Sequence, residues 1–133
     1  MIYYIAARYE SRLKMCSWKA EIEELGHRVQ ARWLGGKHSW LDTRGDVPLT
    51  TKRLWAEEDV ADVFACDELI AVNPPEGSGP GRGGRHTEVG IAIARGIPIH
   101  VIGRRENIFH FLSQVTVYET FEDFLKCLPE FGS

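Results

Sequence analysis

The chain has 133 residues, which fits one domain that is large enough to bury a hydrophobic core. Its formal net charge of −3 excludes a basic protein that attracts nucleic acid polymers through its overall field. No apolar run approaches the length needed to cross a membrane, and the three cysteines lack the spacing of metal ligands. We therefore expect a cytoplasmic protein with no membrane contact, no nucleic acid partner, no metal and no cofactor.

Short apolar runs alternate along the chain with segments whose apolar residues recur at helical spacing. The predicted strands are residues 2–7, 29–33, 69–72, 97–102 and 115–118. The predicted helices are residues 11–25, 52–65, 86–95, 107–112 and 120–128. The alternation predicts an α/β fold in which residues 1–133 form one doubly wound, flavodoxin/Rossmann-like domain. Its five parallel strands would carry helices on both faces, most simply in the order 2-1-3-4-5.

A strand, a glycine-rich loop and a helix in the middle of the chain are predicted to form a ligand site. In a flavodoxin-like sheet, ligands bind beyond the carboxyl ends of strands 1 and 3, where residues 6–8 and residues 73–85 are expected. The helix that follows carries Glu88 in its predicted first turn. A helix N-terminus favours negative charge, so we expect the Glu88 carboxylate to be ionised and to serve as a nucleophile or an anchor.

Three potentially cationic residues, Arg82, Arg85 and His86, surround the start of this helix and suit an anionic ligand group such as a phosphate. Residues 79–84 also match the G-x-G-x-x-G pattern of dinucleotide-binding proteins. That match lies in the third strand–helix unit, and its proline removes one N–H that a phosphate would need. A dinucleotide-dependent redox protein would also need an acidic residue at the end of strand 2, where residues 32–34 are Arg-Trp-Leu.

Two further side chains are ambiguous from residue type and spacing. Asp59 lies among three other acidic residues of its predicted helix, a pattern that usually indicates a solvated face. Tyr3 faces opposite to Tyr4 on strand 1 and would more often be a core aromatic than a site residue. Composition and spacing therefore predict an anionic ligand near Glu88 and no particular reaction.

Three segments, taken in order along the chain, carry a more specific resemblance. Residues 2–7, IYYIAA, form an opening strand with tyrosine. Residues 59–67, DVADVFACD, place one aspartate eight residues before the aspartate that opens strand 3. Residues 84–98, GRHTEVGIAIARGIP, match the pattern E-x-G-x-A-x-x-x-G-x-P. With these segments the chain resembles the nucleoside 2-deoxyribosyltransferase family, which includes the 2'-deoxynucleoside 5'-monophosphate N-glycosidases.

The resemblance implies an enzyme that cleaves the N-glycosidic bond of 2'-deoxynucleosides or of their 5'-monophosphates and transfers deoxyribose to another base or to water. It implies that Glu88 is the nucleophile, that Asp59 orients the sugar or handles the proton of the departing base, and that Tyr3 positions the glutamate. The Gly-Ser pair that helps to hold phosphate in the monophosphate hydrolases is replaced here by Ala6-Ala7. We expect the substrate to be bound by Ala6, Arg8, Gly84, Arg85, His86 and Asn107.

Members of this family are homo-oligomers whose sites borrow residues from a neighbouring subunit. The resemblance therefore implies a homodimer or a larger homo-oligomer, with Asn107, Phe109 and His110 after strand 4 as expected donors to the neighbour's site. The alternative is a non-catalytic module on the same fold that binds or senses a nucleotide at the glycine-rich loop. Asp59 and Glu88 together argue against that alternative, because binding an anion requires no added carboxylates.

Overall fold

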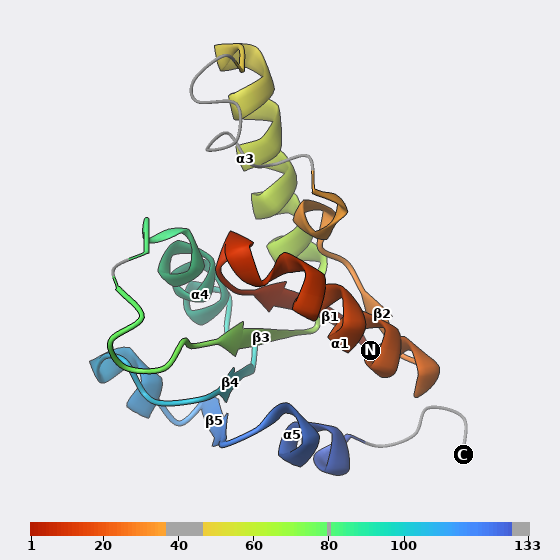
Figure 1. Ribbon diagram of the computed structural model, residues 1–133, viewed down its shortest axis with the longest axis vertical. Coiled ribbons are helices and arrows are strands. Elements are labelled where there is room, and N and C mark those ends of the chain that lie inside the picture. Colours follow the sequence, from red (N-terminus) through yellow and green to blue (C-terminus); the bar gives the residue numbers. More distant parts are fainter. Residues whose placement is uncertain (37–46, 80, 129–133) are drawn as a thin grey trace.

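The computed structural model describes residues 1–36, 47–79 and 81–128. These residues form a parallel sheet with the strand order β2-β1-β3-β4-β5, which confirms the predicted fold class and topology. Figure 1 shows the strands between helices that flank them. The strands are β1 (Ile2–Ala6), β2 (Arg28–Val29), β3 (Glu68–Val72), β4 (Ile99–Ile102) and β5 (Val115–Tyr118). The helices are α1 (Arg12–Glu24), α3 (Leu49–Ala65), α4 (Gly84–Ala94) and α5 (Phe121–Cys127), with the 3-10 helices η1 (Tyr9–Ser11), η2 (Arg32–Gly35) and η3 (Ile108–Phe111).

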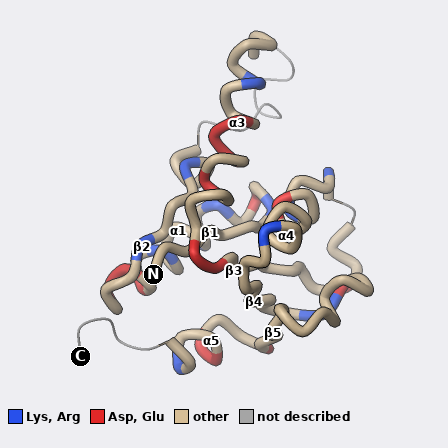
Figure 2. The backbone as a smooth tube through the Cα atoms, turned by 180° about the vertical axis from the view of Figure 1, so that it is seen from behind, with Lys and Arg blue, Asp and Glu red and all other residues tan. Residues whose placement is uncertain are grey.

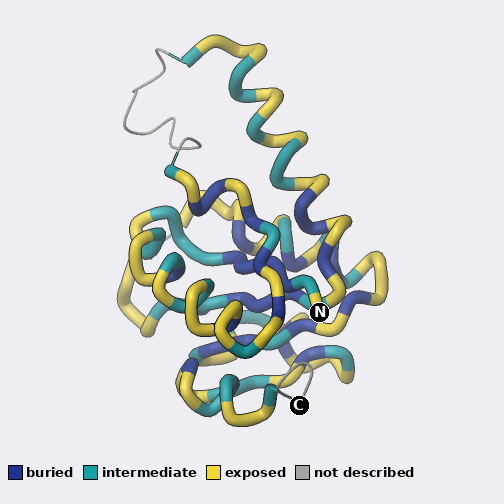
Figure 3. The backbone as a smooth tube through the Cα atoms, turned by 90° about the vertical axis from the view of Figure 1, so that its right-hand side faces the viewer, coloured by how far each residue is buried: buried dark blue, intermediate teal, exposed yellow. Residues whose placement is uncertain are grey.

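Each face of the sheet is covered by a pair of helices. On one face α1 and α5 pack together, and Trp18 stacks on Phe121 with ring centroids 4.2 Å apart. On the other face α3 and α4 contact each other and both contact β1. Successive side chains of a strand point to opposite faces, so Tyr3 and Tyr4 are both fully buried but in different layers. Figure 3 shows that buried positions concentrate in the strands and in the helix sides that face them.

Helix α3 extends beyond the rest of the chain at its N-terminal end (Figure 1). Leu49 and Leu54, near its start, are 77% and 52% exposed, whereas Val63, near its end, is fully buried. The half of α3 that carries Asp59 and Asp62 is therefore the half that lies against the sheet. No helix in the described part of the chain, α3 included, is long and apolar enough to cross a membrane.

The predicted strand over residues 29–33 is shorter in the structure, where β2 contains only Arg28–Val29 and the chain turns into η2. Two side-chain hydrogen bonds explain the early end of the strand. The carboxylate of the buried Asp62 accepts a hydrogen bond from the backbone N–H of Arg32 at 2.8 Å. The indole of Trp33 donates to a β1 carbonyl at 2.8 Å. The two bonds thus satisfy the N–H of Arg32 and a carbonyl of β1. A longer β2 would have to pair such backbone groups within the sheet.

Candidate functional site

Tyr4 and Glu88 meet on the face of the sheet that α3 and α4 cover. The Tyr4 hydroxyl donates a hydrogen bond to the Glu88 carboxylate, across 84 positions of sequence. Tyr4 belongs to the central part of the sheet and is fully buried, whereas Glu88 on α4 is half-buried. The parallel fold thus places a carboxylate that remains partly accessible beside a hydroxyl that is held rigidly by the core.

Tyr3, which was expected to position Glu88, lies on the opposite face of the sheet. Its ring packs edge-on against His27 and Phe124, and its hydroxyl lies 3.9 Å from the sulfur of Met1. The prediction that Tyr3 contacts Glu88 is therefore wrong. The neighbouring Tyr4 makes this contact, because successive side chains of a strand alternate between the two faces of the sheet.

Glu88 lies one turn inside α4 and not in its first turn. The helix begins at Gly84, two residues earlier than predicted, because Gly83 adopts a φ of 91° that ends the loop there. Burial raises the pKa of Glu88 to about 8; the Tyr4 hydrogen bond opposes this shift, and the charges of two acidic residues on α3 add to it. The expectation of an ionised carboxylate is thus reversed, since most of the Glu88 side chains are protonated near neutral pH.

These two acidic residues are Asp59 and Asp62, one turn apart on α3, along which Figure 2 shows acidic positions in red. Asp62 is buried and holds the connection after β2, where its carboxylate accepts hydrogen bonds from the side chains of Gln30 at 3.0 Å and Arg32 at 3.1 Å. Asp59 is half-buried. Burial of Glu88 is the main cause of its raised pKa, and the negative charge of Asp59 raises that pKa further. The structure therefore brings Asp59 near the tyrosine–glutamate pair and gives Asp62 a structural contact.

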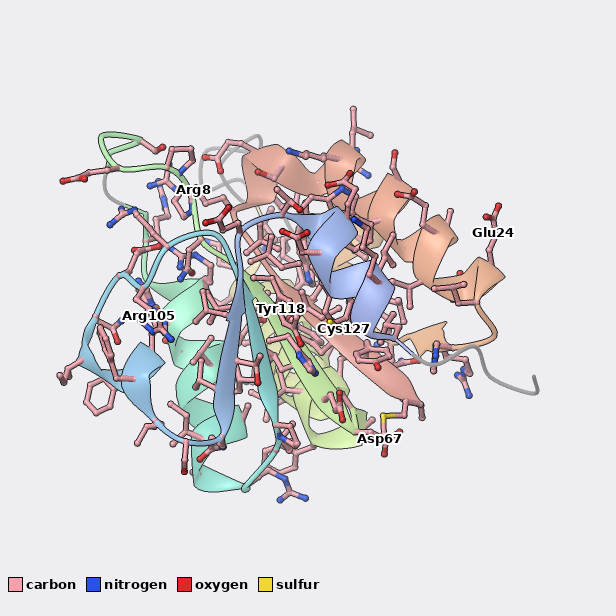
Figure 4. The ribbon with its side chains drawn as sticks, turned by 90° about the horizontal axis from the view of Figure 1, so that it is seen from below. Arg8, Glu24, Asp67, Arg105, Tyr118 and Cys127 are labelled. Atoms are coloured by element: carbon pink, nitrogen blue, oxygen red, sulfur yellow. The ribbon has the colours of Figure 1, made fainter. Side chains whose placement is uncertain are left out.

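Arg8, Ala6 and Gly84 surround the edge of the sheet at which the glycine-rich loop lies. The Arg8 guanidinium donates to the carbonyl of Ser78 at 2.9 Å and to the carbonyl of Gly79. Figure 4 shows Arg8 beside the segment that follows β3. Ala6 ends β1 and is fully buried, and a side chain added at Gly84 would meet open space. A ligand can therefore approach the backbone at the start of α4, while Arg8 anchors the loop.

Arg85 and Glu106 form a buried ion pair at the start of α4. Their nitrogen and oxygen atoms are 2.8 Å apart, and the side chains are 8% and 16% exposed. Arg85 also donates to the side-chain oxygen of Asn73, and His86 Nε2 lies 3.5 Å from the other Glu106 oxygen. Burial opposes ionisation of Glu106, but Arg85, His86 and Arg104 hold its pKa below the usual value. No spacing in the sequence singles out Glu106, which follows two arginines in a loop.

Asn107 lies beside a groove on another side of α4. Its side chain accepts a hydrogen bond from the backbone N–H of Phe109 at 2.9 Å and caps η3. By helical spacing, Glu88 falls on the opposite side of α4 from the groove residues His86 and Gly90. The groove has a volume of about 460 Å³ and is lined by His86, Val89, Gly90, Ile93, Asn107 and Phe109.

The chemistry available around Glu88 is that of two carboxylates and a tyrosine hydroxyl. Within residues 1–36, 47–79 and 81–128, no group of three His, Cys, Asp or Glu side chains is arranged to hold a metal ion. A carboxylate beside a second carboxylate can attack a sugar carbon or stabilise positive charge on the ring, while the second transfers a proton. The arrangement therefore suits glycosidic bond chemistry.

Two solved structures share this fold over nearly the whole chain. One is a 2-deoxyribosyltransferase from the psychrotolerant bacterium Bacillus psychrosaccharolyticus, with a TM-score of 0.70, 19% identity, and coverage of 93% of this chain and 90% of that chain. Another is a CMP N-glycosidase from Clostridium botulinum, with a TM-score of 0.58, 24% identity, and coverage of 95% of both chains. The chain matches no protein-family model and no curated protein. At these identities the likeness shows the fold, and it agrees with the resemblance in the sequence.

Proposed function

We propose that this chain is an enzyme of the nucleoside 2-deoxyribosyltransferase family that breaks the N-glycosidic bond of 2'-deoxynucleosides or of their 5'-monophosphates. The observation that carries the proposal is the hydrogen bond from Tyr4 to Glu88, with Asp59 close enough to influence the titration of Glu88. The fold shared with a 2-deoxyribosyltransferase and with a CMP N-glycosidase supports this choice among the functions that an α/β sheet can carry.

In the proposed reaction, an ionised oxygen of Glu88 attacks the anomeric carbon of the sugar as the C–N bond breaks. The bonding electrons leave with the base, which takes a proton from the carboxyl group of Asp59. The base or water that later attacks the sugar returns a proton to Asp59. The ring passes through an oxocarbenium-like state, which the Glu88 carboxylate stabilises and then traps as a glycosyl ester. Attack on this ester by a second base completes a transfer, and attack by water completes a hydrolysis.

The Tyr4 hydroxyl has a positioning role in this scheme. Its hydrogen bond aims one carboxylate oxygen of Glu88 and stabilises the charged form. Since burial raises the pKa of Glu88 to about 8, the fraction of enzyme with an ionised nucleophile increases as the pH rises from neutrality through that value. The activity of the free enzyme should therefore rise as the pH increases through about 8.

We further propose a homodimer or a larger homo-oligomer in the cytoplasm, with Asn107 contributing to a neighbour's site. Exposed apolar side chains on α3 and after β4 support the assembly, because apolar side chains that gather into a large exposed patch often mark a protein–protein interface. Asn107 stands beside an apolar groove at which another subunit can pack. On α3 and after β4, the exposed large apolar residues among the described ones are Leu49, Leu54, Val60, Phe64, Ile108, Phe109, Phe111 and Leu112.

The test is incubation of the protein with the common 2'-deoxynucleosides and their 5'-monophosphates, with and without a second free base. Chromatography would follow released and exchanged bases. Exchange that requires the acceptor base would identify a transferase, and release without an acceptor would identify a hydrolase. Binding of these compounds with no turnover of any would contradict the proposal and favour the non-catalytic nucleotide-binding module.

A further inference from the structure

A cationic centre at the start of α4 is already occupied by a carboxylate of the chain itself. Glu106 lies in the loop after β4. Arg85 and His86, the second and third residues of α4, both face it. The Arg85 nitrogen lies 2.8 Å and the His86 nitrogen 3.5 Å from a different oxygen of this carboxylate. Arg85 lies one turn before Glu88 on the same side of α4, whereas His86 lies on the other side. The phosphate of a substrate at Glu88 that reached Arg85 would need the space and the charge that Glu106 takes.

We propose that Glu106 is a specificity-determining residue: its carboxylate acts as a resident anion that fills the Arg85–His86 centre and excludes a substrate phosphate from it. The preferred substrate is then a nucleoside without a 5'-phosphate. This last step rests on the proposed function, whereas the anion centre itself does not.

Contacts with its neighbours hold the Glu106 side chain against Arg85 and His86, so it is not a mobile charge on the surface. Its side chain is 16% exposed, and its backbone N–H donates to Nδ1 of the buried His110 at 2.8 Å. Arg85 is held in turn by the side chain of Asn73, whose amide nitrogen donates to the carbonyl of Arg104 at 2.8 Å. Both partners of the ion pair are thus positioned from the loop after β4.

The centre also has more donors than Glu106 uses. Among the described residues, the buried Nε of Arg85 has no hydrogen-bond partner. Arg104, which is exposed, adds a further positive charge that favours the ionised form of Glu106. Removing the Glu106 carboxylate would therefore leave a partly buried positive centre beside a helix N-terminus, and such a centre binds anions.

The test replaces Glu106 with Ala and, to keep the shape of the side chain, with Gln. The charge-matched control is Glu76→Ala, which removes an exposed acidic side chain from the neighbouring loop after β3. Inorganic phosphate and pyrophosphate are titrated at constant ionic strength, and Tm and heat of binding are measured. We expect both Glu106 variants to bind pyrophosphate about tenfold or more tightly than the wild type and Glu76→Ala do.

A double variant, Glu106→Gln with Arg85→Gln, tests whether the gained site is this one. It should lose the gain in pyrophosphate binding. Wild-type protein that binds pyrophosphate as tightly as the Glu106 variants would overturn the inference, and so would a gain that survives removal of Arg85. A Glu106 variant that is folded but gains no affinity would show that the ion pair is only structural, which also overturns it.

Activity measurements separate this inference from the proposed function. In Glu106→Gln, the ratio of kcat/KM for a 2'-deoxynucleoside 5'-monophosphate to kcat/KM for the nucleoside should rise by about tenfold. An unchanged ratio would overturn the specificity role. If no variant turns over any substrate, the proposed function fails, and the pyrophosphate titration still decides whether Glu106 occupies an anion centre.

Discussion

Replacing Glu88 with Gln should stabilise the folded protein at alkaline pH. In the fold the pKa of Glu88 is about 8, against 4.5 in an exposed chain, so the unfolded state loses its proton first as the pH rises. The stability that this raised pKa provides is complete below pH 4.5 and is lost as the pH rises through 8. A difference of about 3.5 pKa units corresponds to about 5 kcal/mol. Because Glu88 is only half-buried, solvent screening reduces the expected effect to about 2–4 kcal/mol.

Urea denaturation followed by circular dichroism at pH 5 and pH 9 measures this effect. We compare the free energy of unfolding of Glu88→Gln with that of the wild type at each pH. This difference should be more favourable to the variant at pH 9 than at pH 5, by about 2–4 kcal/mol. Glu76→Gln, which neutralises an exposed carboxylate, serves as the control and should show no such change. A relative stability of Glu88→Gln that stays the same at both pH values would refute the burial argument for Glu88.

Asp62→Ala should lower the free energy of unfolding, measured by urea denaturation, by about 1–3 kcal/mol, because it leaves partly buried donors of the connection after β2 without their acceptor; wild-type stability would refute that role. Tyr4→Phe should raise the pKa of Glu88 by about one to two units, since a hydrogen bond to a charged group is worth about 1.5–3 kcal/mol. A carboxyl NMR titration checks this, and an equal shift in Tyr3→Phe would contradict the assignment of Tyr4. Gly103→Ala should lower Tm, because its φ is +112° and the new Cβ would lie 2.6 Å from a backbone oxygen; an unchanged Tm would disprove this clash.

The strands and their order were predictable because they depend on patterns within single segments. Apolar runs such as residues 69–72 and 99–102 identify buried parallel strands, and the alternation with helices leaves few topologies. The end of β2 was not predictable in this way. It depends on Asp62, which approaches from a helix about 30 residues later and captures the backbone of Arg32.

The same reasoning explains the outcome for the tyrosine pair. The alternation of a strand separates Tyr3 from Tyr4, but it does not say which face α4 will cover. The hydrogen bond between Tyr4 and Glu88 shows that α4 covers the Tyr4 face. This bond joins segments 84 positions apart in the sequence. The role of Glu106 was not predictable for a similar reason, because its ion-pair partner Arg85 lies on a different element.

The protonation of Glu88 shows how tertiary burial can override a local rule. A position near a helix N-terminus favours a charged carboxylate. The start of α4 at Gly84 moves Glu88 away from that end, and packing of α3 and α4 against β1 removes solvent from its side chain. Two nearby carboxylates on α3 act in the same direction. The sequence identifies the residue, whereas its charge state depends on the packed structure.

The proposed covalent bond between Glu88 and the sugar can be tested by trapping it. Wild-type protein is mixed with a 2'-deoxynucleoside in the absence of an acceptor base and quenched in acid, and its peptides are analysed by mass spectrometry. A deoxyribosyl group should be found at Glu88 on the α4 peptide of the wild type. Glu88→Gln should show neither this adduct nor release of the base. Base release by Glu88→Gln at the wild-type rate, with no sugar attached to α4 in the wild type, would contradict the proposal.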